Sequence, residues 1–191
     1  HRGHQMMLNV GRAVARDSET ELEAITFDPH PAYVVNPESA PPMISSISER
    51  TELLFAEGVK GVRVIPFTHE LAQQTPEEFV KQHLAECLNV VVGQNFTFGA
   101  GAAGTVDTLR DLGVTYGFTV HPVDLATDGD GATLSSSRVR GLVNEGDVAG
   151  AMRVLGRAFT LAGTVVYGDQ RGRQLGYPTA NLRWDMSRLI P

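Results

Sequence analysis

Residues 75–93 read TPEEFVKQHLAECLNVVVG and contain the structural unit on which the fold is built. Thr75 offers a capping hydroxyl, Pro76 occupies the first turn, and two glutamates then face the positive end of the helix dipole. These residues predict a helix from Thr75 to about Leu88, and the apolar run at 89–93 predicts a short buried strand. A helix followed directly by such a strand is typical of a parallel sheet covered by helices.

The same unit of helix then strand recurs through the first 155 residues. Apolar residues at helical spacing mark the helices, and β-branched runs mark the strands. The sequence therefore predicts one doubly wound α/β domain over residues 1–155. The further predicted pairs are a helix at 5–16 with a strand at 22–27, a helix from Ser48 to Gly58 with a strand at 62–67, and a helix at 105–112, after a glycine-rich loop at 99–104, with a strand at 116–123.

The pattern changes after Gly156. Residues 159–168 mix β-branched and aromatic side chains without a helix signal, and the remainder is rich in glycine, arginine and turn residues. We expect residues 156–191 to be the opening strands of a separate β domain. Because the sequence starts at His1 and stops at Pro191, directly after an apolar pair, we also expect the chain to be part of a longer protein.

The composition is that of an ordinary globular chain. Hydrophobic residues make up 42% of the 191 residues, charged residues 20% and aromatic residues 7%, values that disfavour disorder, collagen and coiled coil. The sequence contains neither the roughly 18 apolar residues of a membrane helix nor a secretory signal, so we expect a cytoplasmic protein. The single cysteine, Cys87, excludes an internal disulfide, and we place it in a helix.

Charge is distributed unevenly along the chain. Residues 1–133 carry 8 Lys/Arg against 18 Asp/Glu, whereas residues 134–191 carry 8 arginines against 4 acids, for a net charge of +4. Since the planar guanidinium suits phosphate, the basic segment is where we expect a polyphosphate ligand, although a plain charged surface is the alternative. Nucleic acid is the weaker candidate, because the whole chain is acidic and lacks a long basic run.

The first four residues, HRGH, place His1 and His4 three positions apart at the entry to a helix. Such a pair, together with the free N–H groups of a helix start, can bind phosphate. A purification-tag remnant or plain surface is an alternative. A metal site is the poorer interpretation, since His30, on another loop, is the one further ligand nearby.

Two further motifs follow predicted strands, where ligands bind in open α/β sheets. TFDPHP at 26–31 contains two prolines that stiffen a loop around His30. GQNFTFG at 93–99 offers the Asn95 amide, which can read a ring edge, and the rings of Phe96 and Phe98, which can stack on a planar ligand or pack the core.

Two motifs in the basic segment complete the set. LSSSRVR at 134–140 places three hydroxyls before Arg138 and Arg140 at a helix start, which suits a triphosphate. In residues 168–181, glycines allow close backbone approach to phosphate, and Thr179 and Asn181 are oxygen donors of the kind that Mg²⁺ accepts. From its residues alone, the last segment reads equally well as a β-hairpin.

Taken together, the motifs resemble the bacterial bifunctional FAD synthetase family, in which a riboflavin kinase is fused to an FMN adenylyltransferase. The resemblance rests on HRGH, TFDPHP, VVGQNFTFG, LSSSRVR and RGRQLGYPTANL in family order, and it spans residues 1–182. It implies that 1–155 is a Rossmann-like nucleotidyltransferase domain lacking its first strand. It also implies that 156–191 begins an incomplete riboflavin kinase β-barrel.

The resemblance implies a role for each candidate residue. For transfer of AMP from ATP to FMN, it makes His1, His4 and Arg140 catalytic. It implies that Mg²⁺ accompanies ATP. It also implies that riboflavin and FMN are substrates and that FAD is a product. The remaining implied sites are Ser136, Ser137, Arg138, Asn95, Gly168, Arg171 and Gly172 for ATP; Phe27, His30, Pro31 and Phe98 for the flavin; and Thr179 and Asn181 for the metal.

The sequence departs from the family pattern at two places and leaves it incomplete at two others. Ser137 stands where the family usually has threonine, which keeps the hydroxyl, and Thr133 and Leu134 precede the serines where some relatives carry a basic residue. A strand and glycine loop that normally precede HRGH, and a general base that lies after PTAN, are outside this sequence.

The rival functions are a nucleotidyltransferase with another acceptor and a non-catalytic flavin- or nucleotide-binding module. We expect small molecules as partners and expect no binding to nucleic acid or to a membrane. A weak homo-oligomer is an open alternative to a monomer.

Overall fold

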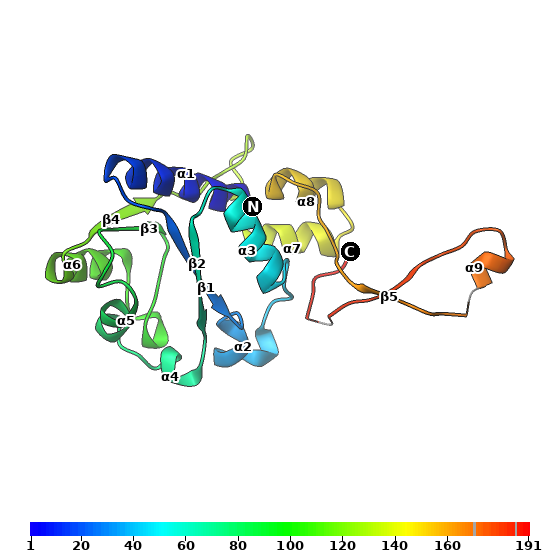
Figure 1. Ribbon diagram of the computed structural model, residues 1–191, viewed down its shortest axis with the longest axis horizontal. Helices are drawn as coiled ribbons and strands as arrows, with labels where there is room; N and C mark the ends of the chain where they lie inside the picture. Colours follow the sequence, from blue (N-terminus) through cyan, green and yellow to red (C-terminus); the bar gives the residue numbers. More distant parts are fainter. Residues whose placement is uncertain (170, 186) are drawn as a thin grey trace.

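Figure 1 shows the computed structural model of the chain, which describes residues 1–169, 171–185 and 187–191. We call residues 1–155 the body and residues 163–183 the arm, which projects away from the body in Figure 1. The helices are α1 (Arg2–Asp17), α2 (Ala32–Val35), α3 (Ile47–Ala56), α4 (His69–Ala72), α5 (Pro76–His83), α6 (Val106–Tyr116), α7 (Ser136–Asn144), α8 (Val148–Leu155) and α9 (Arg171–Gln174), with 3-10 turns η1 (Pro37–Ser39) and η2 (Ala100–Ala102). The strands are β1 (Glu23–Asp28), β2 (Gly61–Pro66), β3 (Asn89–Gly93), β4 (Thr119–Val123), β5 (Thr164–Val166) and β6 (Asn181–Arg183).

The body is a mixed α/β structure with parallel strands, as the sequence predicts. β1 pairs with β2 from Glu23 opposite Gly61, and β3 pairs with β4 from Asn89 opposite Thr119. Helices α1 and α3 lie on one side of these strands and α5 and α6 on the other (Figure 1). Among the described strands, β1–β2 and β3–β4 form two separate hydrogen-bonded pairs and not one continuous sheet.

A shared hydrophobic core joins the two strand pairs. Val90 and Val92 alternate inward along β3 and pack with Ile65 of β2, while Val80 and Leu109 bring in α5 and α6. Both Val80 and Leu109 are 0% exposed. Burial of apolar surface stabilises a fold by about 25 cal/mol per Å², and this shared core holds the two strand pairs together.

A second hydrophobic core lies under α7 and α8. Its centre is Val139, Val143 and Ala151, each 0% exposed. Leu189, far along the chain, is 2% exposed and belongs to the same core. Leu189 therefore completes the packing of the core under α7 and α8.

The strongest sequence prediction, the helix at Thr75, is confirmed at its start and wrong at its end. The Thr75 hydroxyl and the Glu78 carboxylate cap each other's backbone N–H groups in a complete capping box. The helix stops at His83 instead of Leu88, because Leu84 turns into the core and is 6% exposed. Cys87 consequently lies in the turn before β3, outside any helix.

The arm is an antiparallel pair, β5 with β6, in which Val166 lies opposite Asn181. The predicted strand at 159–168 is confirmed only at 164–166. Gly163 passes so close to the Arg183 carbonyl that an added Cβ would lie 2.7 Å from its oxygen. The described residues of the arm form no closed barrel.

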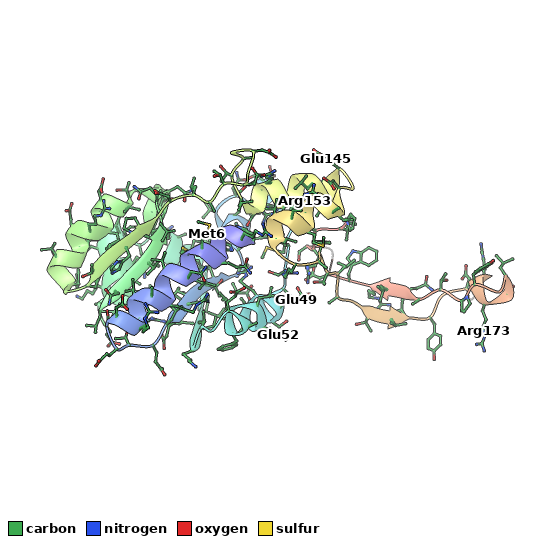
Figure 2. The ribbon with its side chains drawn as sticks, turned by 90° about the horizontal axis from the view of Figure 1, so that it is seen from above. Met6, Glu49, Glu52, Glu145, Arg153 and Arg173 are labelled. Carbon is green, nitrogen blue, oxygen red and sulfur yellow. The ribbon has the colours of Figure 1, made fainter. Side chains whose placement is uncertain are left out.

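Residues 187–189, which we call the strap, return to the body. The Met43 N–H donates to the Ser187 carbonyl at 2.7 Å, and the Leu189 N–H donates to the Met43 carbonyl at 2.8 Å. The Arg188 guanidinium is buried and forms a 2.8 Å ion pair with Glu49 of α3. Figure 2 shows Glu49 near the junction of body and arm, and Arg173 at the distant tip.

Within the residues that the structure describes, none of the helices combines the length and the apolar character needed to cross a bilayer.

Candidate functional site

The two histidines of HRGH lie together at the start of α1. His1 is the N-cap and accepts a hydrogen bond from the His4 N–H at its Nδ1 atom, over 3.3 Å. The two rings stack with centroids 3.9 Å apart. Although His4 keeps contact with solvent, desolvation by its surroundings, assisted by the charge of Arg50, lowers its pKa below the usual 6.5. A neutral imidazole at this position can donate and accept hydrogen bonds.

The start of α1 meets the loop that leads into α7. Gly3 lies so close to the Leu134 carbonyl that an added Cβ would be 2.8 Å from its oxygen. The HRGH and LSSSRVR motifs, more than a hundred residues apart in sequence, are therefore neighbours. Two helix N-termini, each with free N–H groups and positive potential, are brought to one region.

The serines of LSSSRVR divide their roles. Ser135 caps α7, accepting the Arg138 N–H at 3.3 Å. Ser136 and Ser137 occupy the first turn after the cap, and Ser137 is exposed. Their hydroxyls are placed to supplement the helix N–H groups in binding an anion.

The two arginines of the motif point to different partners. Arg138 forms a 2.5 Å ion pair with Asp128 and donates to the Ala132 carbonyl at 3.2 Å, so it supports the preceding loop. Arg140 donates through Nε to the Pro42 carbonyl at 2.8 Å, which leaves its terminal nitrogens for other acceptors. Burial lowers the pKa of Arg140, an effect that nearby Tyr33 opposes.

The loop after β1 places His30 beside these groups. Its Nδ1 atom accepts the Ala32 N–H at 3.2 Å, and Pro31 precedes the first residue of α2. Burial, followed by the positive charges of Arg140 and Arg50, lowers the pKa of His30. His30 therefore belongs to the same electrostatic neighbourhood as His4.

Arg50 is a site residue that no motif indicates. It lies on α3, and its Nη1 atom donates to Thr26 Oγ1 at 2.8 Å and to the Phe27 carbonyl at 3.2 Å. The contact joins residues 24 positions apart, so the local sequence carries no signal of it. Together with Arg140, Arg50 makes the end of β1 a region of positive potential, and the imidazoles of His4 and His30 add hydrogen-bonding groups that suit phosphate.

The aromatic residues of the TFDPHP and GQNFTFG motifs lie in the core or pack against it. Phe27 packs edge-on against Phe67 with centroids 5.4 Å apart. Phe98 is 7% exposed and stacks on Phe96 at 5.5 Å, so the larger free surface belongs to Phe96. Asn95 is exposed, directly after the end of β3.

The arm brings its candidate residues together through glycines. A Cβ on Gly168 would collide with the Asn181 amide, and a Cβ on Gly172 would collide with the Tyr177 carbonyl and lie 3.1 Å from Thr179 Oγ1. Arg171 is exposed and pairs with Asp169 at 3.1 Å. The loop is therefore closed by backbone contact around two oxygen-bearing side chains.

These oxygen donors fit a magnesium ion that arrives with ATP. Mg²⁺ prefers hard oxygen ligands, takes few from protein, and fills its remaining positions with water and phosphate. The side-chain oxygens of Thr179 and Asn181 are of this kind, and both residues are exposed. The glycine cradle keeps bulk away from them.

The chain matches two family models and several curated proteins. Residues 1–138 match the FAD synthetase family, and residues 155–191 match the riboflavin kinase family. It is 32% identical to the bifunctional riboflavin kinase/FMN adenylyltransferase of Bacillus subtilis, over 100% of this chain and 61% of that protein. The enzymes of the same name from Pseudomonas fluorescens and Escherichia coli K12 are 35% and 32% identical, over 99% and 95% of this chain and 61% and 59% of theirs. The chain thus spans about three fifths of the length of these relatives.

The fold is also that of a solved structure. A crystal structure described as a macrolide-efflux protein from Streptococcus pneumoniae aligns with a TM-score of 0.88 and 30% identity, covering 100% of this chain and 62% of that one. The family match covers the two helix starts, the β1 loop and the end of β3 described above. On this evidence, the chain belongs to the FAD synthetase family, with a riboflavin kinase segment after it.

Proposed function

We propose that the protein containing this chain makes FAD by phosphorylating riboflavin to FMN and then transferring AMP from ATP to FMN. The observation that carries the proposal is the meeting of the α1 and α7 N-termini at Gly3 and Leu134, beside Arg50 and Arg140. Helix N-termini and guanidinium groups together are suited to a triphosphate. We assign the adenylyltransferase to residues 1–155 and the start of the kinase to 156–191.

In adenylyl transfer, an oxygen of the FMN phosphate attacks the α-phosphorus of ATP. The bond from that phosphorus to the bridging oxygen breaks, and pyrophosphate leaves. His1 and His4 would donate hydrogen bonds to the phosphates as charge develops, while Ser136, Ser137 and Arg140 would hold the departing pyrophosphate. Arg138 would act mainly by fixing the loop at Asp128. Catalysis of this kind depends on positioning and charge stabilisation, and Mg²⁺ bound with ATP supplies further neutralisation.

We assign the flavin to the side formed by the β1 loop and the end of β3. His30 and Pro31 would border it, and Asn95 would contact FMN or the transferred nucleotide. Phe27 and Phe98 would support this wall from the core, given how little of Phe98 is exposed.

For the kinase step, the riboflavin 5′-hydroxyl would attack the γ-phosphorus of ATP, and ADP would leave. Thr179 and Asn181 would hold Mg²⁺ with ATP, and Gly168, Arg171 and Gly172 would line the nucleotide. The close approach of both glycines to these side chains supports the assignment. The substrates are small molecules, and we place the enzyme in the cytoplasm, where ATP is supplied.

Pyrophosphate release tests the proposal directly. The natural full-length protein, given FMN and ATP–Mg²⁺, should release one pyrophosphate for each FAD formed, and riboflavin should yield FMN first. Calorimetry under the same conditions should detect binding of both substrates. Binding without turnover would indicate a non-catalytic flavin- or nucleotide-binding module, and turnover with another acceptor but not FMN would indicate a different nucleotidyltransferase.

A further inference from the structure

Arg50 connects α3 to the end of β1 through its side chain. A single nitrogen, Nη1, reaches both the Thr26 hydroxyl and the Phe27 carbonyl, within the last three residues of β1. The guanidinium is partly buried, and it lies near Asp28, whose negative charge opposes the lowering of the Arg50 pKa by burial. The strand end and the loop that follows are thus tied to α3.

The helix that presents Arg50 is itself fixed. Ser46 and Glu49 form a capping box at its start, with Ser46 N–H donating to the Glu49 carboxylate at 2.7 Å. Glu49 is also bound to buried Arg188 of the strap. A guanidinium presented by so constrained a helix holds its partners in one geometry.

The surroundings of Arg50 contain the other candidate groups. His4 comes from α1, Asp28 from the end of β1, His30 from the loop after it, and Arg140 from α7. These elements meet at the end of β1, so a shift of that strand end would move His30 relative to the α1 and α7 starts.

We propose that Arg50 is a positioning residue for adenylyl transfer: through Thr26 and Phe27 it holds the end of β1, and with it the His30 loop, in register with the α1 and α7 N-termini. This inference rests on the proposed function. Replacing Arg50 should lower the rate of FAD formation strongly, because displacing a reacting group by about 1 Å can reduce a rate by on the order of 100-fold.

The test compares Arg50→Met and Arg50→Lys with the matched variant Arg12→Met in the natural full-length protein. Arg12 ties α1 to the other end of α3 through the Glu57 carbonyl and carboxylate, whereas Arg50 ties α3 to the end of β1. Arg50→Met should lower kcat for FAD formation by roughly 30- to 100-fold, with KM for FMN changed less than about threefold. Arg50→Lys, which keeps a charged donor, should recover much of the loss, and Arg12→Met should change kcat less than about twofold.

The pH profile separates positioning near the histidines from a loss of stability. Removing the Arg50 charge raises the pKa values of His4 and His30, so the acid limb of kcat/KM should move to higher pH in Arg50→Met and stay in place in Arg50→Lys and Arg12→Met. Asp28 and Arg140 are present in all variants, so their electrostatic effect on the histidines stays the same.

The outcomes distinguish this inference from the proposed function. If the unaltered protein forms FAD and Arg50→Met loses no more kcat than Arg12→Met, the role of Arg50 is refuted while the function stands. If the unaltered protein binds ATP–Mg²⁺ but forms no FAD, the proposed function fails and the role of Arg50 in adenylyl transfer falls with it.

Discussion

In the body, the candidate site is surrounded by side chains from α1, α3, α7 and the β1 loop. Phe27, near the end of β1, packs on one hydrophobic core, and α7 contributes Val139 and Val143 to the other. In the arm, the candidate loop is closed by two glycines, and Tyr167 and Tyr177 are 98% and 80% exposed. The comparison separates two ways of building a phosphate site. The first fixes functional groups by packing, and the second fixes them by backbone contact, so the same kind of substitution should have different consequences in each.

The largest effect is expected at His4. His4→Ala should lower kcat for FAD formation by about 10²- to 10³-fold, because it removes a donor to developing charge. FMN affinity, measured by calorimetry, should change less than about threefold, and riboflavin phosphorylation should not change. Equal losses in turnover and FMN binding would mean that His4 only supports the fold.

Leucine substitutions test the packing contrast. Leu109→Ala, at a side chain that is 0% exposed in the body, should reduce the free energy of unfolding by about 2–5 kcal/mol. Leu175→Ala, at a side chain that is 75% exposed in the arm, should change it by less than about 0.5 kcal/mol. Urea unfolding measures the free energy of unfolding of both variants. Similar losses in Leu109→Ala and Leu175→Ala would contradict the proposed difference in packing between body and arm.

Two ion pairs test how far the strap stabilises the body. Glu49→Gln leaves the buried charge of Arg188 without its partner and should cost about 3 kcal/mol. Asp107→Asn breaks an exposed 2.6 Å pair with Arg110 and should cost less than about 1 kcal/mol. An equally small cost at Glu49 would show that the strap contributes little to the stability of the body.

The Glu49 effect should also depend on pH. Burial acts to raise the pKa of Glu49, but hydrogen bonds from Ser46 and Arg188 outweigh it and lower the pKa. A depressed folded-state pKa contributes stability above the unfolded value, about 4.3, and this is lost as pH falls through the folded value. The stability difference between Glu49→Gln and the unaltered protein should therefore shrink in acid. A constant difference would contradict this linkage.

The smallest effect is expected in the arm loop. Gly172→Ala forces the backbone away from the Tyr177 carbonyl and should lower riboflavin phosphorylation about tenfold, with little change in unfolding free energy. Gly129→Ala is the control, because an added Cβ there meets nothing within 4 Å. An unchanged kinase rate in Gly172→Ala would remove the argument for a backbone-built site.

Local chemistry made much of this structure predictable. The capping box at Thr75 and the strand at 89–93 depend on residues close in sequence, and so does the start of α7. The two motifs at helix starts could be assigned to phosphate for the same reason. Their proximity, however, depends on the close approach of Gly3 to Leu134, which neither motif reveals alone.

Long-range packing accounts for what the sequence did not predict. The early end of α5 follows from the burial of Leu84, and the core position of Phe98 follows from its contacts with Phe79 and Phe96. Arg50 acts across 24 residues, and Arg188 reaches Ile44 across 144. No local pattern of residue types indicates such partners.

The strap has a consequence for any attempt to use the body as a separate unit. A protein cut after Leu155 would keep every proposed adenylyltransferase residue and yet lose Leu189, whose side chain fills the core under α7 and α8. That core sits behind the LSSSRVR helix. Transplanting the adenylyltransferase into a synthetic pathway would therefore require either carrying residues 187–189 along or refilling their place with a designed apolar side chain.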